Sequence, residues 1–568
     1  MLNLLPYPKY VKINEGFLTG KNLKIITSGC DERVKKAAQK LPQNDDGAVT
    51  EIICTDRYLP EEYELFITED KIHIESGGSA GAFYAVQTLR QLFLMDKVPC
   101  CHIVDRPDFH YRGFYHDVTR GQVPKVETLK KLIDNLAYYK INSLQLYVEH
   151  TFEFKEYAGI SEKKGFLTAE EIKELDEYCF ENFIEFIPSL STFGHLYELL
   201  EQDRYKHLRE IENFESQEMF WCDRMQHHTI DPVNPESFEL VKSLIDAYMP
   251  LFKTDKFNIC CDETFDLYKG KHKNDDVGRL YVDFVIKLVS YLKSKGKTVM
   301  MWADILLQHP EQALRLPDDV ILLNWNYERN PSESNIEKIY QMNKNQIVCP
   351  GTGSWSRLCE SVDKEESNIS LMAEYGDKYH ALGMLNTNWG DWGNPCSLEL
   401  AMYGMVLCAC KSWNLNTSLN KDYMDAVNAL LYGDDKGVMY IKRLDDIHKG
   451  ISWNNFASMY SNKVYNTDMN VEIPGEKELK ETRDRCMKFI ADLSGETGSD
   501  TKYRREMLIA CEGLAVMSEL YAKMCGFKME RLTNTEDWLA KYSENWRRKN
   551  KESELSEIIK MFIAVENL

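Results

Sequence analysis

Acidic and aromatic side chains gather where the predicted strands end. The run FNICCDETFDLYKG, residues 257–270, closes a short apolar strand with two adjacent carboxylates, Asp262 and Glu263. Successive side chains of a regular strand point to opposite faces. Two neighbouring acids therefore share a ligand only where the chain leaves the extended form. The pair indicates either an ordinary exposed strand end or a site in which both acids face one substrate.

The ends of the other predicted strands carry residues of the same kinds. These are Asp117, Arg120, Glu149, His150, His195, Trp302, Asp304, Trp325, Glu328, Trp389, Asp391 and Trp392. Tryptophans offer flat faces to sugar C–H groups, carboxylates and arginine bind hydroxyls, and a carboxylic acid can protonate a glycosidic oxygen. Singly, a strand-end Asp is usually a cap and a Trp usually core. Together they predict a carbohydrate site.

Other chemistries lack their motifs. No glycine-rich strand-to-helix loop carries Lys-Ser or Lys-Thr, and no G-x-S-x-G elbow occurs. His227 and His228 are adjacent rather than one helical turn apart, so they are a weak metal signal. We expect neither a metal nor a cofactor.

The elements that must position these side chains alternate between strand and helix. Eight apolar strands are predicted at 112–118, 142–148, 183–190, 256–261, 298–303, 320–325, 346–350 and 381–388. Amphipathic helices are predicted between them at 125–140, 168–183, 236–249 and 278–296. This pattern favours a (β/α)8 TIM barrel in the α/β class, with chemistry at the C-terminal ends of the strands. A doubly wound open sheet is the alternative.

Two further regions flank the predicted barrel. Residues 1–105 combine short strands, including a hairpin at 63–76, with a helix at 80–95, and predict an α+β domain. The barrel takes residues 106–418. Residues 419–568 are helical and charged, and we expect them to pack on the barrel or to support a homodimer.

Composition narrows the partners. The chain has 568 residues and a formal net charge of −21, which opposes binding to nucleic acid or to an anionic membrane surface. No apolar run approaches the roughly 20 residues of a membrane span, and no secretory signal is visible. The 16 scattered cysteines indicate reduced thiols in a cytoplasmic protein.

These segments, in this order, resemble the glycoside hydrolase family 20 β-N-acetylhexosaminidases. GGSAGAFYAVQTLRQLF (77–93) is similar to the helix of that family's N-terminal domain, and YRGFYHDVTRGQVPKVETLKKLIDNLAYYKINSLQL (111–146) to its first strand, helix and second strand. CCDETFDL (260–267) and NTNWGDW (386–392) resemble its Asp-Glu and Trp-x-acid motifs. The resemblance covers roughly residues 1–415.

The resemblance implies an exo-acting, retaining enzyme that releases terminal β-GlcNAc or β-GalNAc from a small oligosaccharide or glycoconjugate. The nucleophile would be the substrate's own 2-acetamido oxygen. Glu263 would be the general acid and then the base, and Asp262 would orient the acetamido group. The resemblance also assigns substrate-binding roles to Arg112, Trp302, Trp325, Trp389, Asp391 and His195.

Several positions depart from the family pattern and indicate a divergent subgroup. The usual His-x-Gly-Gly before the acids is Asn258-Ile259-Cys260-Cys261, and the usual His-x-x-Asp of strand two is replaced by residues 147–150. The acetamido-binding tyrosine has no counterpart in GTGSWSRL (351–358). Alternatives are a same-fold hydrolase that releases a disaccharide or a modified amino sugar, and a non-catalytic carbohydrate-binding protein.

Overall fold

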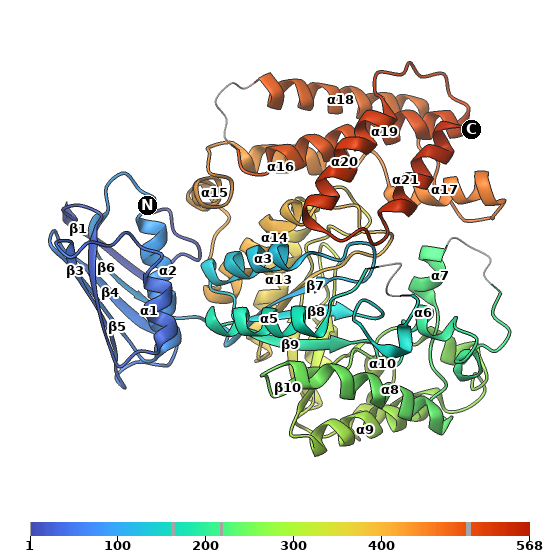
Figure 1. Cartoon of the computed structure of the whole chain (residues 1–568), viewed down its shortest axis with the longest axis horizontal. Coiled ribbons are helices and arrows are strands. Elements are labelled where there is room, and N and C mark those ends of the chain that lie inside the picture. The colour runs from blue at the N-terminus through green and yellow to red at the C-terminus, as the bar shows by residue number, and fades with distance from the viewer. Residues whose placement is uncertain (1, 161–164, 216–219, 496–500) are drawn as a thin grey trace.

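The chain folds into three parts that follow one another along the sequence (Figure 1). The computed structural model describes residues 2–160, 165–215, 220–495 and 501–568. An N-terminal α+β domain, a closed barrel and a C-terminal set of helices account for nearly all regular structure in these ranges. The predicted fold class is confirmed.

The N-terminal domain is a six-stranded sheet with the strand order β1-β6-β4-β5-β3-β2. Its strands are β1 Tyr10–Phe17, β2 Leu23–Ser28, β3 Ala48–Cys54, β4 Tyr63–Ile67, β5 Lys71–Ser76 and β6 Pro99–Asp105, with helices α1 Glu32–Ala38 and α2 Ser79–Leu92. The predicted hairpin is the antiparallel pair β4–β5. Side chains of β5 alternate between buried and half-buried, as expected for a sheet that is covered by helices on one face.

Eight parallel strands close into the barrel, in the order β7 to β14 around its axis. They are β7 Tyr111–Asp117, β8 Ser143–Val148, β9 Glu185–Leu190, β10 Lys256–Asn258, β11 Thr298–Trp302, β12 Ile321–Trp325, β13 Asn345–Cys349 and β14 Gly383–Asn388. All eight were predicted, and the open-sheet alternative is wrong. Their near-continuous apolar character follows from burial on both faces.

Helices cover the outside of the barrel (Figure 1). The longer ones are α3 Val126–Tyr138, α5 Ala169–Glu181, α8 Pro235–Tyr248, α9 Val277–Ser294, α12 Ser334–Gln341, α13 Val362–Lys378 and α14 Met402–Trp413. Local sequence sets where several begin. Thr168 and Glu171 form a reciprocal capping box at the start of α5. Asn234 caps α8, and Pro235 occupies its first turn, where a missing N–H costs nothing.

The C-terminal region is helical and packs over one side of the barrel (Figure 1). Its helices are α15 Lys421–Val427, α16 Gly437–His448, α17 Trp453–Tyr465, α18 Glu476–Gly495, α19 Arg504–Cys525, α20 Thr535–Lys549 and α21 Leu555–Glu566. The α18–α19 pair is the most extensive helix contact, and both helices bury apolar stripes. Among the described helices, none is long and apolar enough to cross a bilayer.

The structure contradicts the prediction that Arg112 binds substrate. Arg112 is the second residue of β7 and lies at the end of the barrel opposite the site. Its fully buried guanidinium donates to Glu61 Oε1 at 2.7 Å, to Tyr84 Oη at 3.1 Å and to the carbonyl of Lys140 at 3.0 Å. Arg112 therefore joins the N-terminal domain to the barrel.

Candidate active site

The two adjacent acids follow a sharp turn at the end of β10. The strand stops at Asn258, whose Oδ1 accepts the backbone N–H of Cys260 at 2.9 Å. Cys260 and Cys261 both have left-handed backbones, with φ of 55° and 65°. Such positions favour glycine, which agrees with the Gly-Gly of the family pattern. Here buried thiols replace it, with Cys260 Sγ 3.3 Å from Ser189 Oγ. The turn brings both acids to one side.

His195 lies between the two carboxylates. Its Nε2 is 3.6 Å from Asp262 Oδ2 and 3.3 Å from Glu263 Oε2. Burial by itself lowers the pKa of His195, but the two carboxylates outweigh it and raise the pKa to about 10. An imidazolium at neutral pH therefore links the pair, in keeping with the supporting role predicted for this histidine.

Gly194 lets the histidine loop approach the acids closely. A Cβ at this position would lie 2.4 Å from the backbone oxygen of Asp262, which is too short for any real contact. We expect Gly194→Ala to displace Asp262 and lower kcat by about tenfold or more, because small misplacements of catalytic groups are costly. Gly475→Ala is the control, since no atom lies within 4 Å of that Cβ. An unchanged kcat in Gly194→Ala would contradict this dependence.

Asp304, the first residue of α10 Asp304–Gln308, forms a hydrogen bond with the backbone of Glu263. Its Oδ2 accepts the backbone N–H of Glu263 at 3.0 Å. Burial, and then the charge of Asp262, raise the pKa of Asp304 to about 7. Glu263 itself has a left-handed backbone, with φ of 48°. Asp304 thus stabilises the backbone conformation that directs Glu263 toward the pocket.

Aromatic rings cluster near the acids, and Trp325 and Tyr327 line an open hollow that we call the aromatic pocket. Trp302 is fully buried and contacts Tyr115 and Trp389, with ring centroids 5.2 and 5.7 Å apart. Trp325 stacks on Tyr327 at 5.2 Å, and Trp389 Nε1 donates to Tyr327 Oη at 2.8 Å. The structure therefore brings together all three predicted tryptophans.

Tyr327 is a site residue that sequence reasoning missed. It lies two residues beyond β12, between Trp325 and Trp355, and lines an open hollow with Asp304. The family resemblance placed a tyrosine after the next strand, β13, whereas Tyr327 follows β12. The available signal was the Trp-x-Tyr pattern at the end of β12.

Arg120 is the arginine of the site. It follows β7 at its C-terminal end and donates to Asp391 Oδ1 at 3.2 Å and to Glu149 Oε1 at 3.4 Å. Asp117 holds this arrangement, because it accepts the N–H of Arg120 at 3.0 Å and the N–H of Gly390 at 3.0 Å. Arg120 was predicted as a strand-end residue, whereas the family resemblance assigned sugar binding to Arg112.

Ionisation of Asp391 lowers the stability of the folded protein. Burial raises its pKa to about 6, despite the opposing Arg120 guanidinium. A carboxyl whose pKa is raised in the folded state loses stability by ionising, and this cost is fully present above about pH 6 and gone below about pH 4.

We expect Asp391→Asn to stabilise the protein at pH 8 by about 1–3 kcal/mol, with the gain vanishing toward pH 4. The same variant should raise KM, because an acceptor for sugar hydroxyls is lost. Thermal unfolding across this pH range is the measurement. A gain that is largest at low pH would contradict the assignment.

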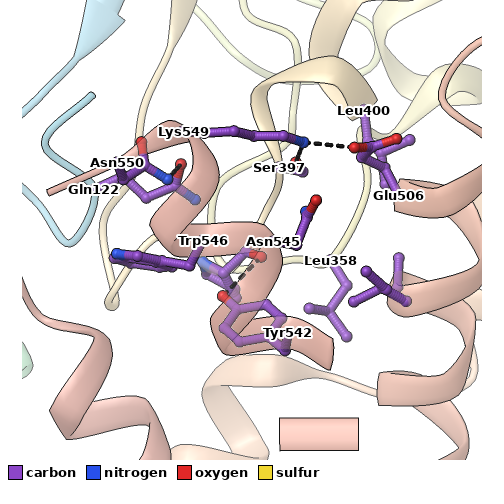
Figure 2. A pocket seen from close by; sticks show the side chains of 13 residues that line it. Gln122, Leu358, Ser397, Leu400, Glu506, Tyr542, Asn545, Trp546, Lys549 and Asn550 are labelled. Atoms are coloured by element: carbon purple, nitrogen blue, oxygen red, sulfur yellow. Dashed lines mark hydrogen bonds and ion pairs between the residues drawn. The ribbon is translucent and has the colours of Figure 1, made fainter. Parts of the chain in front are cut away.

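The C-terminal region reaches the site through its last loop. Lys551 donates its backbone N–H to Val123 O at 2.8 Å, Asn550 Nδ2 donates to Gln122 Oε1 at 3.1 Å, and Gln122 Nε2 donates to Asn394 O at 2.7 Å. Figure 2 shows that Gln122 and Asn550 also line a small cavity together with Tyr542, Trp546 and Lys549. The segment therefore ties together the loops that carry Arg120 and Asp391.

Glu554 extends this contact toward the pocket. Its carboxylate accepts Trp221 Nε1 at 3.0 Å and pairs with Arg224, both from α7 Phe220–Gln226. Arg224 in turn approaches the carbonyl oxygen of Asp391 at 3.5 Å. No motif in the sequence pointed to these residues, because their partners lie more than 300 positions apart.

Metal ligands were not expected, yet two groups of side chains among the described residues have the right types. One is His227, His228 and Asp266, and the other is Glu210, Asp231 and His272, each with its ligand atoms within 4.8 Å of one another. Both groups lie between the loops that follow β9 and β10, outside the aromatic pocket.

Comparison with known proteins agrees with this arrangement. Residues 109–390 match the family described as glycosyl hydrolase family 20, catalytic domain, and residues 1–106 match glycosyl hydrolase family 20, domain 2. The chain belongs to glycosyl hydrolase family 20.

Individual relatives share part of their length with this chain. A beta-hexosaminidase from Akkermansia muciniphila is 32% identical over 158 residues, covering 24% of this chain and 32% of the relative. One from Vibrio furnissii is 25% identical over 425 residues, covering 65% and 66%. The chain thus spans about a third to two thirds of these relatives. A chitobiase structure from Flavobacterium johnsoniae has a TM-score of 0.64 at 18% identity, over 100% of this chain and 99% of that one, and supports the fold.

Proposed function

We propose that the protein is an exo-acting, retaining β-N-acetylhexosaminidase that uses the 2-acetamido group of its substrate as the nucleophile. The observation that carries the proposal is that Asp262 and Glu263 lie side by side, with His195 between them, next to Asp304 of the aromatic pocket. The names of the relatives support the same activity.

The two acids differ in ways that suit different roles. The Glu263 side chain is 29% exposed and that of Asp262 only 10%. Asp262 also lies near the aromatic rings, since after burial its charge is among the causes that raise the pKa of Tyr115 and Tyr327. These differences support the assignment of Glu263 to the leaving group and of Asp262 to the acetamido group.

The reaction then follows in two steps. Glu263 donates its proton to the glycosidic oxygen while the acetamido oxygen attacks the anomeric carbon, and the aglycone leaves as an alcohol. Asp262 accepts the acetamido N–H and stabilises the positive charge that develops on the ring. Glu263 next removes a proton from a water molecule. This water attacks the anomeric carbon, opens the ring that the acetamido oxygen had closed, and releases the sugar with its configuration retained.

Arg120 and Asp391 support exo action. They pair at 3.2 Å beside Trp389 and are positioned to bind hydroxyls of the terminal sugar. Binding of these hydroxyls would limit the enzyme to the release of one terminal residue. The preference between GlcNAc and GalNAc, and a cytoplasmic location, remain predictions.

Release of nitrophenol from aryl β-GlcNAc, β-GalNAc and β-glucoside tests the proposal. We expect turnover of the amino sugars and little turnover of the glucoside, because only the former carry the internal nucleophile. Equal rates on the glucoside would exclude acetamido participation. No turnover of either amino sugar would favour the alternatives of a disaccharide-releasing hydrolase or a binding protein.

A further inference from the structure

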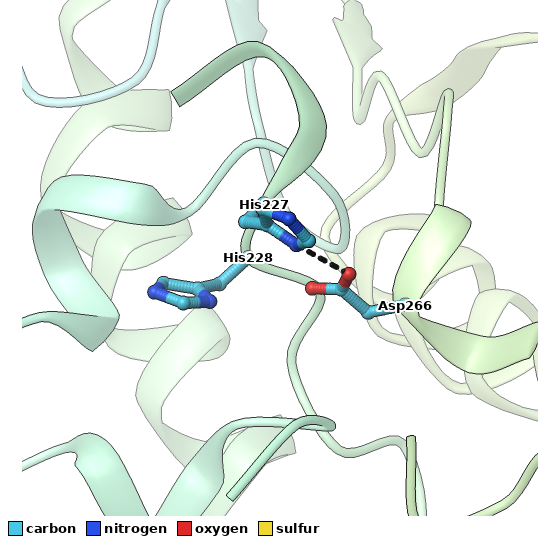
Figure 3. A group of neighbouring side chains, drawn as sticks. All are labelled: His227, His228 and Asp266. Carbon is cyan, nitrogen blue, oxygen red and sulfur yellow. Dashed lines mark hydrogen bonds and ion pairs between the residues drawn. The ribbon is translucent and has the colours of Figure 1, made fainter. Parts of the chain in front are cut away.

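His227, His228 and Asp266 form a compact polar group beside the acids, and the proposed reaction does not use it. The two histidines follow α7 in the loop after β9, and Asp266 is the second residue of the short helix η4 Phe265–Tyr268 in the loop after β10. Figure 3 shows His227 hydrogen-bonded to Asp266, with the ring of His228 extending to the left of this pair.

The hydrogen-bond pattern leaves one imidazole nitrogen of this group ready to bind a ligand. His228 Nε2 contacts Glu201 Oε1 at 2.9 Å, so the proton of the ring belongs there and Nδ1 keeps its lone pair. His228 is 1% exposed, and its Nδ1 has no hydrogen-bond partner among the described residues. A carboxylate behind one nitrogen of a histidine, with the other nitrogen free, is the usual arrangement of a metal ligand.

We propose that His227, His228 and Asp266 form a binding site for a divalent transition-metal ion, with zinc(II) the best fit. Two imidazoles and one carboxylate match the ligands that zinc prefers, whereas calcium and magnesium require oxygen ligands. The ligand atoms lie within 4.8 Å of one another, and tetrahedral coordination with bonds of about 2.1 Å needs separations of roughly 3.4 Å. Side-chain adjustments of about 1 Å close that gap.

The group offers the negative charge of Asp266, and a cation, Arg209, lies nearby and pairs with the Glu201 carboxylate behind His228. Asp266 Oδ1 lies 2.7 Å from His227 Nδ1, so the ion would replace the hydrogen that this pair shares, and the proton would pass to solvent. Phe214 packs against both imidazoles, with ring centroids 4.7 and 4.6 Å away, and shields the group from water. The ion would join the loop after β9 to the loop that carries Glu263, three residues before Asp266.

The second group provides a matched control within the same chain. Both nitrogens of His272 already face carboxylates, Asp275 at 2.8 Å and Asp231 at 3.3 Å, and the ammonium of Lys271 lies 3.2 Å from Asp231. Neither nitrogen of His272 is therefore left to bind a metal. We expect no transition-metal binding there.

Thermal unfolding of the chelator-treated full chain, with and without added Zn²⁺, tests the proposal. We expect saturating Zn²⁺ to raise the Tm by at least about 2 °C in the wild-type protein. We expect the shift to disappear in His227→Gln and His228→Phe and to persist in His272→Ala. Absence of a shift in the wild type, or its persistence in both His227→Gln and His228→Phe, would overturn the site.

Co²⁺ substitution gives a readout that does not depend on activity. Bound Co²⁺ should show the visible absorption of a tetrahedral site with nitrogen ligands, and Glu201→Gln should weaken binding by about 10–100-fold. If His228→Phe fails to fold, His227→Gln decides alone, because that ring is 15% exposed and leaves no cavity in the core. These outcomes are independent of whether the protein hydrolyses amino sugars.

Discussion

Glu263→Gln should slow the release of poor leaving groups by about 10²–10⁴-fold, which is the usual contribution of a general acid. The amide keeps the shape of the side chain but cannot donate the required proton. Activated aryl substrates, whose leaving groups need no protonation, should lose much less. Steady-state kinetics with a series of aryl β-GlcNAc substrates of falling leaving-group pKa is the measurement.

The shape of this dependence separates the role of Glu263 from a structural one. A lost acid makes the rate depend steeply on the leaving group, whereas a distorted pocket lowers all rates together. Equal losses across the series would contradict the assignment. The Tm should change little, because the Glu263 side chain is 29% exposed and its carboxylate contacts only His195 among the described ion pairs.

Arg120→Lys and Arg112→Lys should have opposite signatures. Arg120→Lys should lower kcat/KM by at least about 10²-fold, because an ammonium cannot span Asp391 and Glu149 as the guanidinium does. Arg112→Lys should leave kcat/KM nearly unchanged. It should destabilise the protein by roughly 1–3 kcal/mol, since the buried contacts to Glu61 and Tyr84 are lost.

Each arginine variant is the control for the other, because both exchange the same side chain within one strand and its loop. Kinetics and thermal unfolding of the two variants together are the test. A large loss of kcat/KM in Arg112→Lys with an unchanged Tm would restore the role that the family resemblance assigned to it. The pKa of Glu61 reports on its ion pair with Arg112. Burial by itself raises this pKa, but Arg112 and His110 lower it to about 2.

The prediction of the fold succeeded because burial leaves a strong pattern in the chain. Strands such as β8 and β14 are buried on both faces, so their residues form short apolar runs that stand out from the amphipathic helices between them. The one marked difference is β10, which was predicted over 256–261 and ends at Asn258. Cysteines fit a strand pattern, whereas their left-handed conformation is set by the turn.

The site was predicted in part. Asp262, Glu263, His195, Asp391 and the three tryptophans lie together, because residues at the C-terminal ends of parallel strands meet at one end of a barrel. The prediction for Arg112 was wrong because Arg112 and Arg120 lie only eight positions apart in the sequence. The direction of the strand places them at opposite ends of the barrel. Tyr327 was not predicted, because the family resemblance pointed to a tyrosine in the loop after β13 and Tyr327 lies in the loop after β12.

By itself, the sequence determined the order of the elements, the eight barrel strands and the strand ends that carry the acids, whereas closure of the barrel was decided by the tertiary structure. These depend on local periodicity and on the geometry of parallel strands, which the chain records position by position. Only the tertiary structure decided which arginine faces the pocket, and that Glu554 and Asn550 from the last loop support it. Such contacts join residues hundreds of positions apart, and no local pattern in a single sequence encodes which distant side chain will satisfy a buried charge.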